Sequence, residues 1–260
     1  MNVIANETAI LHRQWLLQDI LPGALNELKN QVEKSLDILL KKGQPDALPV
    51  SSSKDESIKG LITLENLSII KAELTVQLPH YNQDNPFKVI MNTNTPYRLE
   101  QVRQGINYIA LAAERLQRSS TIACGSKQAV IELLDSVCRD IDRARLAFEH
   151  PNDAERFPYK VCQPKKFNPP LREDLVVEFY IKDVHVVCNA IALEFRQGKN
   201  AASNTDTQNN YISYKDKYAT IIHKSQVQTQ SPMLTELRAS LKAVRELCLN
   251  HRQLLLQIDA

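Results

Sequence analysis

The sequence SPMLTELRASLKAVRELCLNHRQLLLQI, residues 231–258, is the stretch from which the fold prediction begins. Its apolar residues recur at alternating steps of three and four, a spacing that keeps them on one face of a helix. Ser231-Pro232 supplies a capping hydroxyl followed by a proline at the first helical position. We therefore predict a helix over residues 231–260 with one leucine-rich seam. The seam residues are Leu234, Leu237, Leu241, Val244, Cys248, His251, Leu255 and Ile258.

Three other segments repeat this spacing. Residues 7–42 predict a long first helix with a kink or short break at Pro22-Gly23, because an interior proline removes a backbone hydrogen bond. Thr95-Pro96 has the same cap pattern as Ser231-Pro232 and predicts the start of a second helix. That helix and the one over Val130–Phe148 should form an antiparallel hairpin. In the first helix the seam includes Leu17, Leu21 and Leu28.

Between the helices the apolar period changes to two, which is typical of strands with one buried face. Residues 70–78 alternate apolar and polar side chains, and residues 58–64 and 87–91 predict partner strands in a three-stranded meander. Prolines between residues 150 and 174 favour an extended connector. Residues 218–224 predict a last strand, after an Asn-rich and Gln-rich loop.

Residues 175–190 predict a β-hairpin with a two-residue turn at Lys182-Asp183. This turn pairs residue 181 with 184 and residue 179 with 186, which places the apolar side chains on one face. Alternation then predicts that Phe179 faces the core, whereas Glu178 and Lys182 face solvent.

These patterns predict an α+β protein. We expect an antiparallel four-helix bundle that pairs the amino-terminal and carboxy-terminal helices, together with a separate antiparallel β-sheet lobe, in an elongated molecule. Dimerisation through the heptads is the alternative use of the seams. The bundle domain is predicted over residues 7–42, 95–149 and 231–260. The β domain is predicted over 58–92 and 170–228, and linkers or loops over 43–57, 150–169 and 199–213.

Composition and motifs narrow the classes of function. The 260 residues contain 32 Lys and Arg against 30 Asp and Glu, a balance that is unlike that of a strongly basic nucleic-acid binder. The six glycines are isolated, so no phosphate-binding loop is predicted. The histidines and five cysteines lack metal-ligand spacing, and no nucleophile motif such as G-x-S-x-G occurs. We expect no catalytic residues, no cofactor and no metal.

A few single residues carry weaker alternatives. Cys162 reads as a reactive thiol or, more simply, as an ordinary loop cysteine. His251 reads as a pH-responsive core residue or as a polar group near a helix end. Lys165-Lys166 reads as a contact for an anionic partner or as solvated surface. The widely spaced cysteines, the absence of a signal peptide and the absence of a long apolar run predict a cytoplasmic protein that does not insert into a membrane.

Three strings and the terminal heptads give the chain a family resemblance. The strings are RQWLLQD at residues 13–19, IKGLITL at 58–64 and EDLVVEFYI at 173–181. With the order of the elements, they resemble the Rogdi family of leucine-zipper-like proteins, which includes the smaller dedicated subunit of the RAVE complex. The chain departs from the family pattern at Pro22-Gly23 and in the Asn-rich loop. No partner-binding residue is assigned from the resemblance, so the partner-binding residues are unknown.

The resemblance implies a non-catalytic assembly role. Its partners would be a large β-propeller-containing RAVE subunit, the V1 sector of the vacuolar proton ATPase and, in fungi, a Skp-type adaptor. The protein would help to rejoin V1 with the membrane sector Vo, and would be recruited peripherally to vacuolar or endosomal membranes. Two other classes stay open: a coiled-coil scaffold of a tethering or cytoskeletal complex, and an enzyme whose site is assembled from dispersed residues.

Overall fold

The structure, a computed structural model, describes residues 11, 14–40, 45–52, 57–66, 68–119, 126–195 and 211–257. The chain divides into two compact units. The helical unit comprises residues 1–41, 102–148 and 233–260, and the β unit comprises residues 42–101 and 149–232. Within the described residues, no helix has the length and apolar character needed to cross a membrane.

The helical unit contains α2 (Leu21–Leu40), α4 (Lys127–Glu149), α5 (Pro232–Gln257) and nearly all of α3 (Glu100–Ser119). Contacts between α3 and α4 run in opposite directions along the two helices, as the predicted antiparallel hairpin requires. Arg115 Nε lies 2.7 Å from Asp140 Oδ2, and a Cβ added at Gly105 would meet the Phe148 ring.

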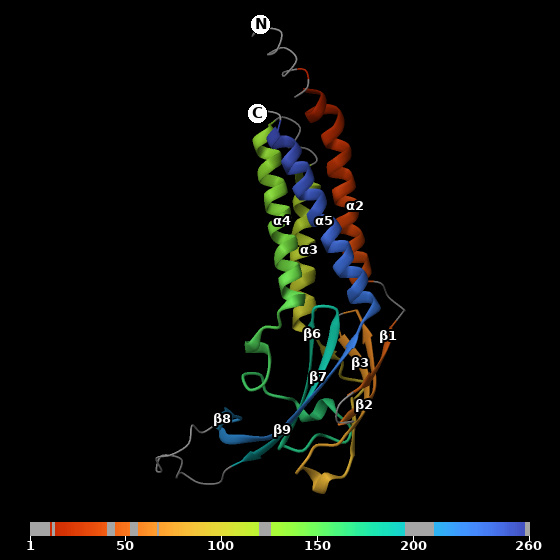
Figure 1. Ribbon diagram of the computed structural model, residues 1–260, viewed down its shortest axis with the longest axis vertical. Helices are drawn as coiled ribbons and strands as arrows, with labels where there is room; N and C mark the ends of the chain where they lie inside the picture. The colour runs from red at the N-terminus through yellow and green to blue at the C-terminus, as the bar shows by residue number, and fades with distance from the viewer. Residues whose placement is uncertain are drawn as a thin grey trace. The chain divides into compact units, whose positions relative to one another are not determined.

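Helix α5 contacts two other helices. Its Arg245 Nε and Arg252 Nε bond Asp142 and Asp135 of α4 at 2.8 and 2.6 Å. Ser240 Oγ lies 2.8 Å from Ser35 Oγ of α2, and Figure 1 shows these two segments from opposite ends of the chain side by side. Apolar side chains fill the interior between these helices, while the arginine pairs lie at half-exposed positions.

The irregularity predicted at Pro22-Gly23 lies just before these residues. Leu16–Ile20 form a π-helix, η1, that closes with a bond from the Leu21 N–H to the Leu16 carbonyl. Pro22 follows as the second residue of α2, but the helical run is continuous from residue 14 to residue 40, so this proline lies inside a helix and not at its start. A proline ring crowds the carbonyl four residues earlier, and the wider π turn relieves that clash.

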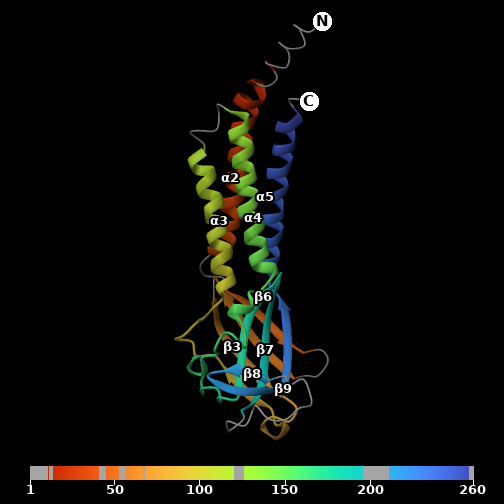
Figure 2. The same ribbon diagram turned by 90° about the vertical axis from the view of Figure 1, so that its left-hand side faces the viewer.

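The β unit contains two antiparallel sheets. In the first, the order is β1-β2-β3-β4, and β5 also pairs with β3; the second has the order β6-β7-β9-β8. Figure 2 shows β6, β7 and β9 next to one another. The first-sheet strands are β1 (Asp46–Ser51), β2 (Ile58–Glu65), β3 (Ser68–Val76), β4 (Phe87–Ile90) and β5 (Tyr97–Arg98); the second-sheet strands are β6 (Leu175–Lys182), β7 (His185–Phe195), β8 (Tyr211–Tyr214) and β9 (Lys217–Gln230).

Side chains join the two sheets where β1 and β9 contact each other. Ser57, directly before β2, shares a hydrogen bond between hydroxyl groups with Ser225 of β9, and both residues are buried. Ser231 lies between the end of β9 and the start of α5, and its hydroxyl donates to Asp46 Oδ2 at 2.7 Å. The buried hydroxyls therefore have partners, as a well-packed interior requires.

The predicted four-helix bundle with one sheet lobe is wrong. The protein is α+β, but its helices are separated along the chain by strands, and the strands form two sheets. A heptad seam shows which face of a helix is apolar, but it does not identify the element that covers this face. Likewise, alternation shows that a segment is a strand but does not assign it to a sheet.

Several boundaries also differ from prediction. Strand β1 lies within the predicted linker 43–57, and β8 overlaps the end of the predicted loop 199–213; residues 196–210 lie outside the described part. The predicted meander is confirmed in β2, β3 and β4. Thr95-Pro96 does not begin α3, because residues 97 and 98 pair with β3 instead. A cap pattern states where a helix can start, and strand pairing overrides it here.

The β6–β7 hairpin is confirmed, but its register is shifted by two residues. Lys182 pairs with His185, so Asp183 and Val184 form the turn in place of Lys182-Asp183. Asp183 adopts a φ of 58°, a conformation that aspartate tolerates better than most residues. A shift of two residues leaves every side chain on its predicted face. Ile181 and Phe179 therefore still share one face of the sheet with their cross-strand partners Val186 and Cys188.

Candidate functional site

Glu178, on β6, is the centre of a buried polar cluster in the β unit. The residue is only 7% exposed. Its Oε2 accepts the Phe157 N–H at 2.8 Å, its Oε1 accepts a bond from Asn189 Nδ2 at 2.8 Å, and an Arg156 nitrogen lies 3.8 Å from Oε1. The prediction that Glu178 faces solvent is therefore wrong. The connector that carries residues 156 and 157 covers the second face of β6.

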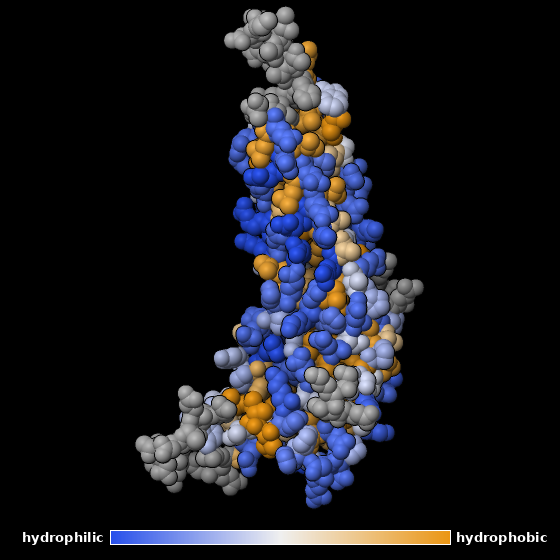
Figure 3. Space-filling view, in the orientation of Figure 1, coloured by the Kyte–Doolittle hydropathy of each residue, from blue (hydrophilic) through white to orange (hydrophobic). Residues whose placement is uncertain are grey.

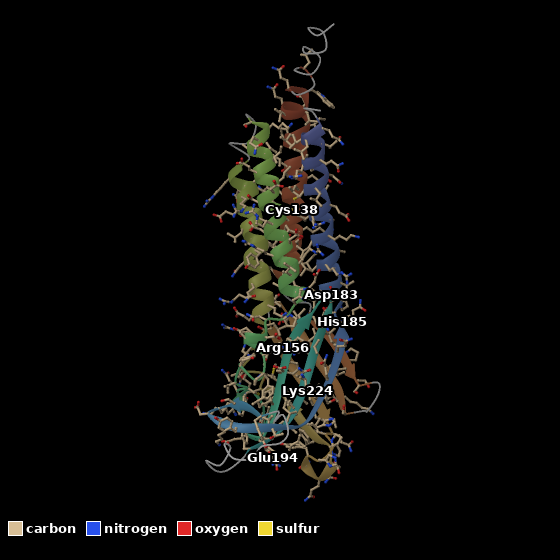
Figure 4. The ribbon with its side chains drawn as sticks, turned by 60° about the vertical axis from the view of Figure 1, so that its left-hand side comes forward. Cys138, Arg156, Asp183, His185, Glu194 and Lys224 are labelled. Carbon is tan, nitrogen blue, oxygen red and sulfur yellow. The ribbon has the colours of Figure 1, made fainter. Side chains whose placement is uncertain are left out.

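Arg156 completes the cluster from the connector side. Its guanidinium lies 3.9 Å from the centre of the Tyr180 ring, a cation–π contact, and Figure 4 labels Arg156 beside the strands of this sheet. Arg156 Nε and Asn189 Oδ1 are buried and have no hydrogen-bond partner among the described residues. Burial raises the pKa of Tyr180, and the Arg156 charge opposes this shift. The cluster thus concentrates polar groups in a mostly apolar interior.

A cavity of about 50 Å³ lies next to Glu178. It is lined on the sheet side by Val176 and Val177 and on the other sides by residues of β5 and the connector, including Tyr97, Arg98 and Lys166. Drug-sized ligands occupy pockets of roughly 300 to 1,000 Å³. The cavity therefore has room for a few waters or for one small chemical group, but not for a nucleotide.

Cationic side chains surround this cavity. The Lys166 amine lies 4.8 Å from the centre of the Tyr97 ring, and burial, together with the nearby charges of Lys160 and Arg98, lowers the pKa of Lys166. Lys160 Nζ lies 2.6 Å from Glu155. Among the described residues, no carboxylate lies within 4.0 Å of the Lys166 amine or the Arg98 guanidinium, which leaves positive charge facing the opening.

Cys162 lines the cavity as a structural residue. Its N–H donates to the Tyr214 hydroxyl at 2.9 Å, and its thiol lies 3.4 Å from the Val177 carbonyl. Burial is the main cause that raises the pKa of this thiol, and burial also raises the pKa values of Cys138, Cys188 and Cys248. A protonated thiol is a poor nucleophile, so the simpler interpretation of Cys162 applies.

Side chains bond the backbone along the edge of β6 that does not pair with β7. Gln101 donates from Nε2 to the Ile181 carbonyl at 2.9 Å and accepts the Ile181 N–H at 2.8 Å. The Phe179 N–H bonds the Tyr97 hydroxyl, and the Cys162 thiol meets the Val177 carbonyl. These contacts replace part of the ladder that a neighbouring strand would supply.

The predicted seam residues belong to the helical unit. Leu17 is half-buried, and Ile258 lies outside the described residues. His251 is half-buried with its Nε2 unpartnered, and burial lowers its pKa. In the described chain, no group of His, Cys, Asp or Glu is arranged to hold a metal. The buried seam residues are Leu21, Leu28, Leu234, Leu237, Leu241, Val244, Cys248 and Leu255.

The association of Glu178, Arg156 and Asn189 was not predicted from the sequence, and Glu178 was expected to face solvent. One signal was present, because Val176 and Tyr180 flank Glu178 on the same face of β6 and are themselves apolar. A strand that is apolar on both faces is covered on both faces, so a charge within it must find partners. The identity of those partners depends on a distant connector, which no local pattern reveals.

Comparison with known proteins finds one family. A family model described as "Rogdi leucine zipper containing protein" matches residues 12–222. The human protein named "Protein rogdi homolog" is 25% identical over 193 residues, which cover 70% of this chain and 66% of the human protein. The Pongo abelii protein gives the same figures. The Caenorhabditis elegans protein of the same name is 22% identical over 179 residues, or 62% of this chain and 60% of the relative.

Proposed function

Because this chain belongs to the Rogdi leucine zipper family, we propose that it is a non-catalytic subunit of a RAVE-like complex that promotes assembly of the V1 and Vo sectors of the vacuolar proton ATPase. The family match over residues 12–222 is the observation that carries the proposal. The matched region spans 66% of the length of the human relative, so the activity and partners of the whole relative are part of the proposal.

The chemistry of the β unit supports a binding role. Its buried charged groups bond one another or backbone groups, and its thiols have raised pKa values. The cavity beside Glu178 is too small for a nucleotide substrate. In this proposal the protein contributes surface to a large β-propeller-containing partner and to V1, with a Skp-type adaptor as a further partner, and reaches vacuolar or endosomal membranes through them.

Affinity purification of the tagged full chain from its native cells tests the partners. We expect a large β-propeller protein and V1 subunits to copurify, and we expect the purified chain alone to hydrolyse no ATP. Recovery of a tethering or cytoskeletal complex in place of pump subunits would favour the scaffold alternative.

Deletion of the gene tests the role. Pump subunits should be present but poorly assembled, with V1 in the cytosol and vacuolar acidification reduced. Cells should be depleted of glucose and then resupplied, and V1 should be measured on isolated membranes. Normal return of V1 to membranes in the deletion cells would contradict the proposal.

A further inference from the structure

The positive cavity beside β6 has no assigned ligand. Its lining includes Arg98, Lys160 and Lys166, with Glu178 as the carboxylate in its wall. Lys160 has a partner in Glu155, whereas the amine of Lys166 and the guanidinium of Arg98 have no carboxylate within 4.0 Å among the described residues. Like charges that share a small space repel one another, and an anion between them relieves this repulsion.

Glu178 would oppose an anion if its charge were unpaired, but it is not. Both of its oxygens accept hydrogen bonds, from the Phe157 N–H and from Asn189, and Arg156 lies 3.8 Å away. The lining carries three cations, Arg98, Lys160 and Lys166, against the single carboxylate of Glu178, so the charge around the cavity is positive on balance. Tyr97 also lines the cavity, and the centre of its ring lies 4.8 Å from the Lys166 amine.

The size of the cavity and its surroundings narrow the ligand. A volume of about 50 Å³ encloses one small anionic group such as a carboxylate, but not a whole nucleotide or sugar phosphate. Val161 lines the opening and is 48% exposed. Tyr159 does not line the cavity, but it precedes the lining residue Lys160 in the chain and is 75% exposed. Apolar surface beside a cationic pocket fits a peptide in which acidic and apolar residues are neighbours.

We propose that this cavity binds the carboxylate of an acidic side chain in an extended segment of a partner protein, with Lys166 and Arg98 as its cations and Val161 and Tyr159 as its apolar contacts. The proposal rests on the proposed function only in that the ligand belongs to a protein. It assigns a recognition site within the β unit that the family match does not supply.

Fluorescence anisotropy of the full chain tests the site. The probe is a fluorescein-labelled peptide of alternating valine and glutamate, and the matched peptide has glutamine in place of each glutamate. The glutamate peptide should bind at least about tenfold more tightly, because charge-assisted bonds contribute more than neutral ones. Added sodium chloride should weaken this binding. Equal binding of the two peptides would overturn the proposal.

Variants then locate the binding site. Lys166→Met keeps the stem over Tyr97 but removes the charge, and Arg98→Gln does the same for the other cation; each should weaken binding by roughly fivefold to tenfold. Lys165→Met is the matched control, because Lys165 lies in the same short turn, η5 (Pro164–Lys166), but does not line the cavity. It should change binding by less than about twofold. If the Lys165 and Lys166 variants lost the same amount of peptide affinity, the peptide would be held by the general positive charge of this turn and not by the cavity. That result would overturn the proposed site.

Folding and the source of the anion have their own controls. Lys166→Arg should retain binding, and a circular dichroism melt should show that the Met and Arg variants fold alike. Vesicles of phosphatidylserine are the competing probe, and binding to them that requires Lys166 without any peptide binding would overturn the peptide assignment. The peptide assay needs no proton pump, so its failure and the failure of the V1 recovery experiment can be told apart.

Discussion

Strands β3 and β6 each carry a glutamate in the middle, and the two residues have opposite environments. Glu73 of β3 is exposed and lies 3.0 Å from Lys71, whereas Glu178 of β6 is buried among Arg156, Asn189 and the Phe157 N–H. Beyond Lys71, β3 alternates buried and exposed residues, but β6 is buried at every position before Lys182. A strand pattern therefore reports the composition of each face, whereas residues elsewhere in the chain decide whether the second face is covered.

The largest loss of stability should come from a substitution on the face of β6 that was predicted to face the core. Phe179→Ala removes a buried ring that packs against Tyr97, with ring centres 5.2 Å apart, and should lower the free energy of unfolding by about 3 to 5 kcal/mol. Urea denaturation of the purified chain measures this loss. Thr75→Ala, at an exposed position of β3, is the control and should change stability by less than about 0.5 kcal/mol.

Glu178 and Glu73 give the direct test of the comparison. Glu178→Ala removes the carboxylate that Arg156 and Asn189 share, although Arg156 keeps Asp153 at 3.6 Å, and it should cost about 3 kcal/mol. Glu73→Ala should cost less than about 0.5 kcal/mol. Glu178→Gln keeps an acceptor for the Phe157 N–H, so its loss of stability should lie between those of the two alanine variants. Equal urea midpoints for the two alanine variants would show that β6 is open on its second face.

The bonds between Gln101 and Ile181 test the edge of β6 that does not pair with β7. Gln101→Leu removes both hydrogen bonds to this residue and leaves a buried N–H and carbonyl unpaired, which should cost about 1 to 3 kcal/mol. Hydrogen exchange at the Ile181 amide should accelerate more than exchange at amides of β3. Unchanged protection at Ile181 would mean that another group pairs with this backbone.

The smallest effect concerns Tyr214, whose ring packs against Phe157 of the connector, with ring centres 5.1 Å apart. Burial raises the pKa of Tyr214 to about 12. The folded chain therefore keeps a proton between about pH 10 and pH 12 that the unfolded chain loses, so this residue makes stability fall as pH rises through that range.

Tyr214→Phe tests this dependence. At neutral pH the variant should be about 1 kcal/mol less stable, because the Cys162 N–H loses its acceptor. Above about pH 10 the difference from the parent chain should narrow, since the variant has no phenol to titrate. Urea denaturation at the two pH values measures this difference. A difference that widens at high pH would contradict the assigned pKa shift.

Local periodicity was sufficient to predict most of the elements. The heptad spacing from Leu234 to Leu255 predicted α5, and strict alternation predicted β3 and the β6–β7 hairpin. One local irregularity was missed: a bulge between β2 and β3 makes Ile69 the inward residue, so that Ile70 is only half-buried. A bulge adds one residue without changing the apolar composition, so alternation alone does not reveal it.

Long-range pairing explains the other differences. Strand β1 pairs with β2, and β5 pairs with β3, so both segments became strands where the local sequence indicated a linker or a helix start. The polar cluster at Glu178 forms because the connector returns over β6. A single sequence carries no pairing information at these separations, and the site was therefore missed while the strands were found.

The side-chain bonds along β6 also bear on how the chain avoids association with other copies. A strand bonded on one side offers its other row of backbone groups to any extended chain, which makes such edges sites of aggregation. Here the side chains of Tyr97, Gln101 and Cys162 form hydrogen bonds with backbone groups in that row of β6. All three precede β6 in the sequence, so during synthesis the guarding side chains leave the ribosome before the edge that they protect.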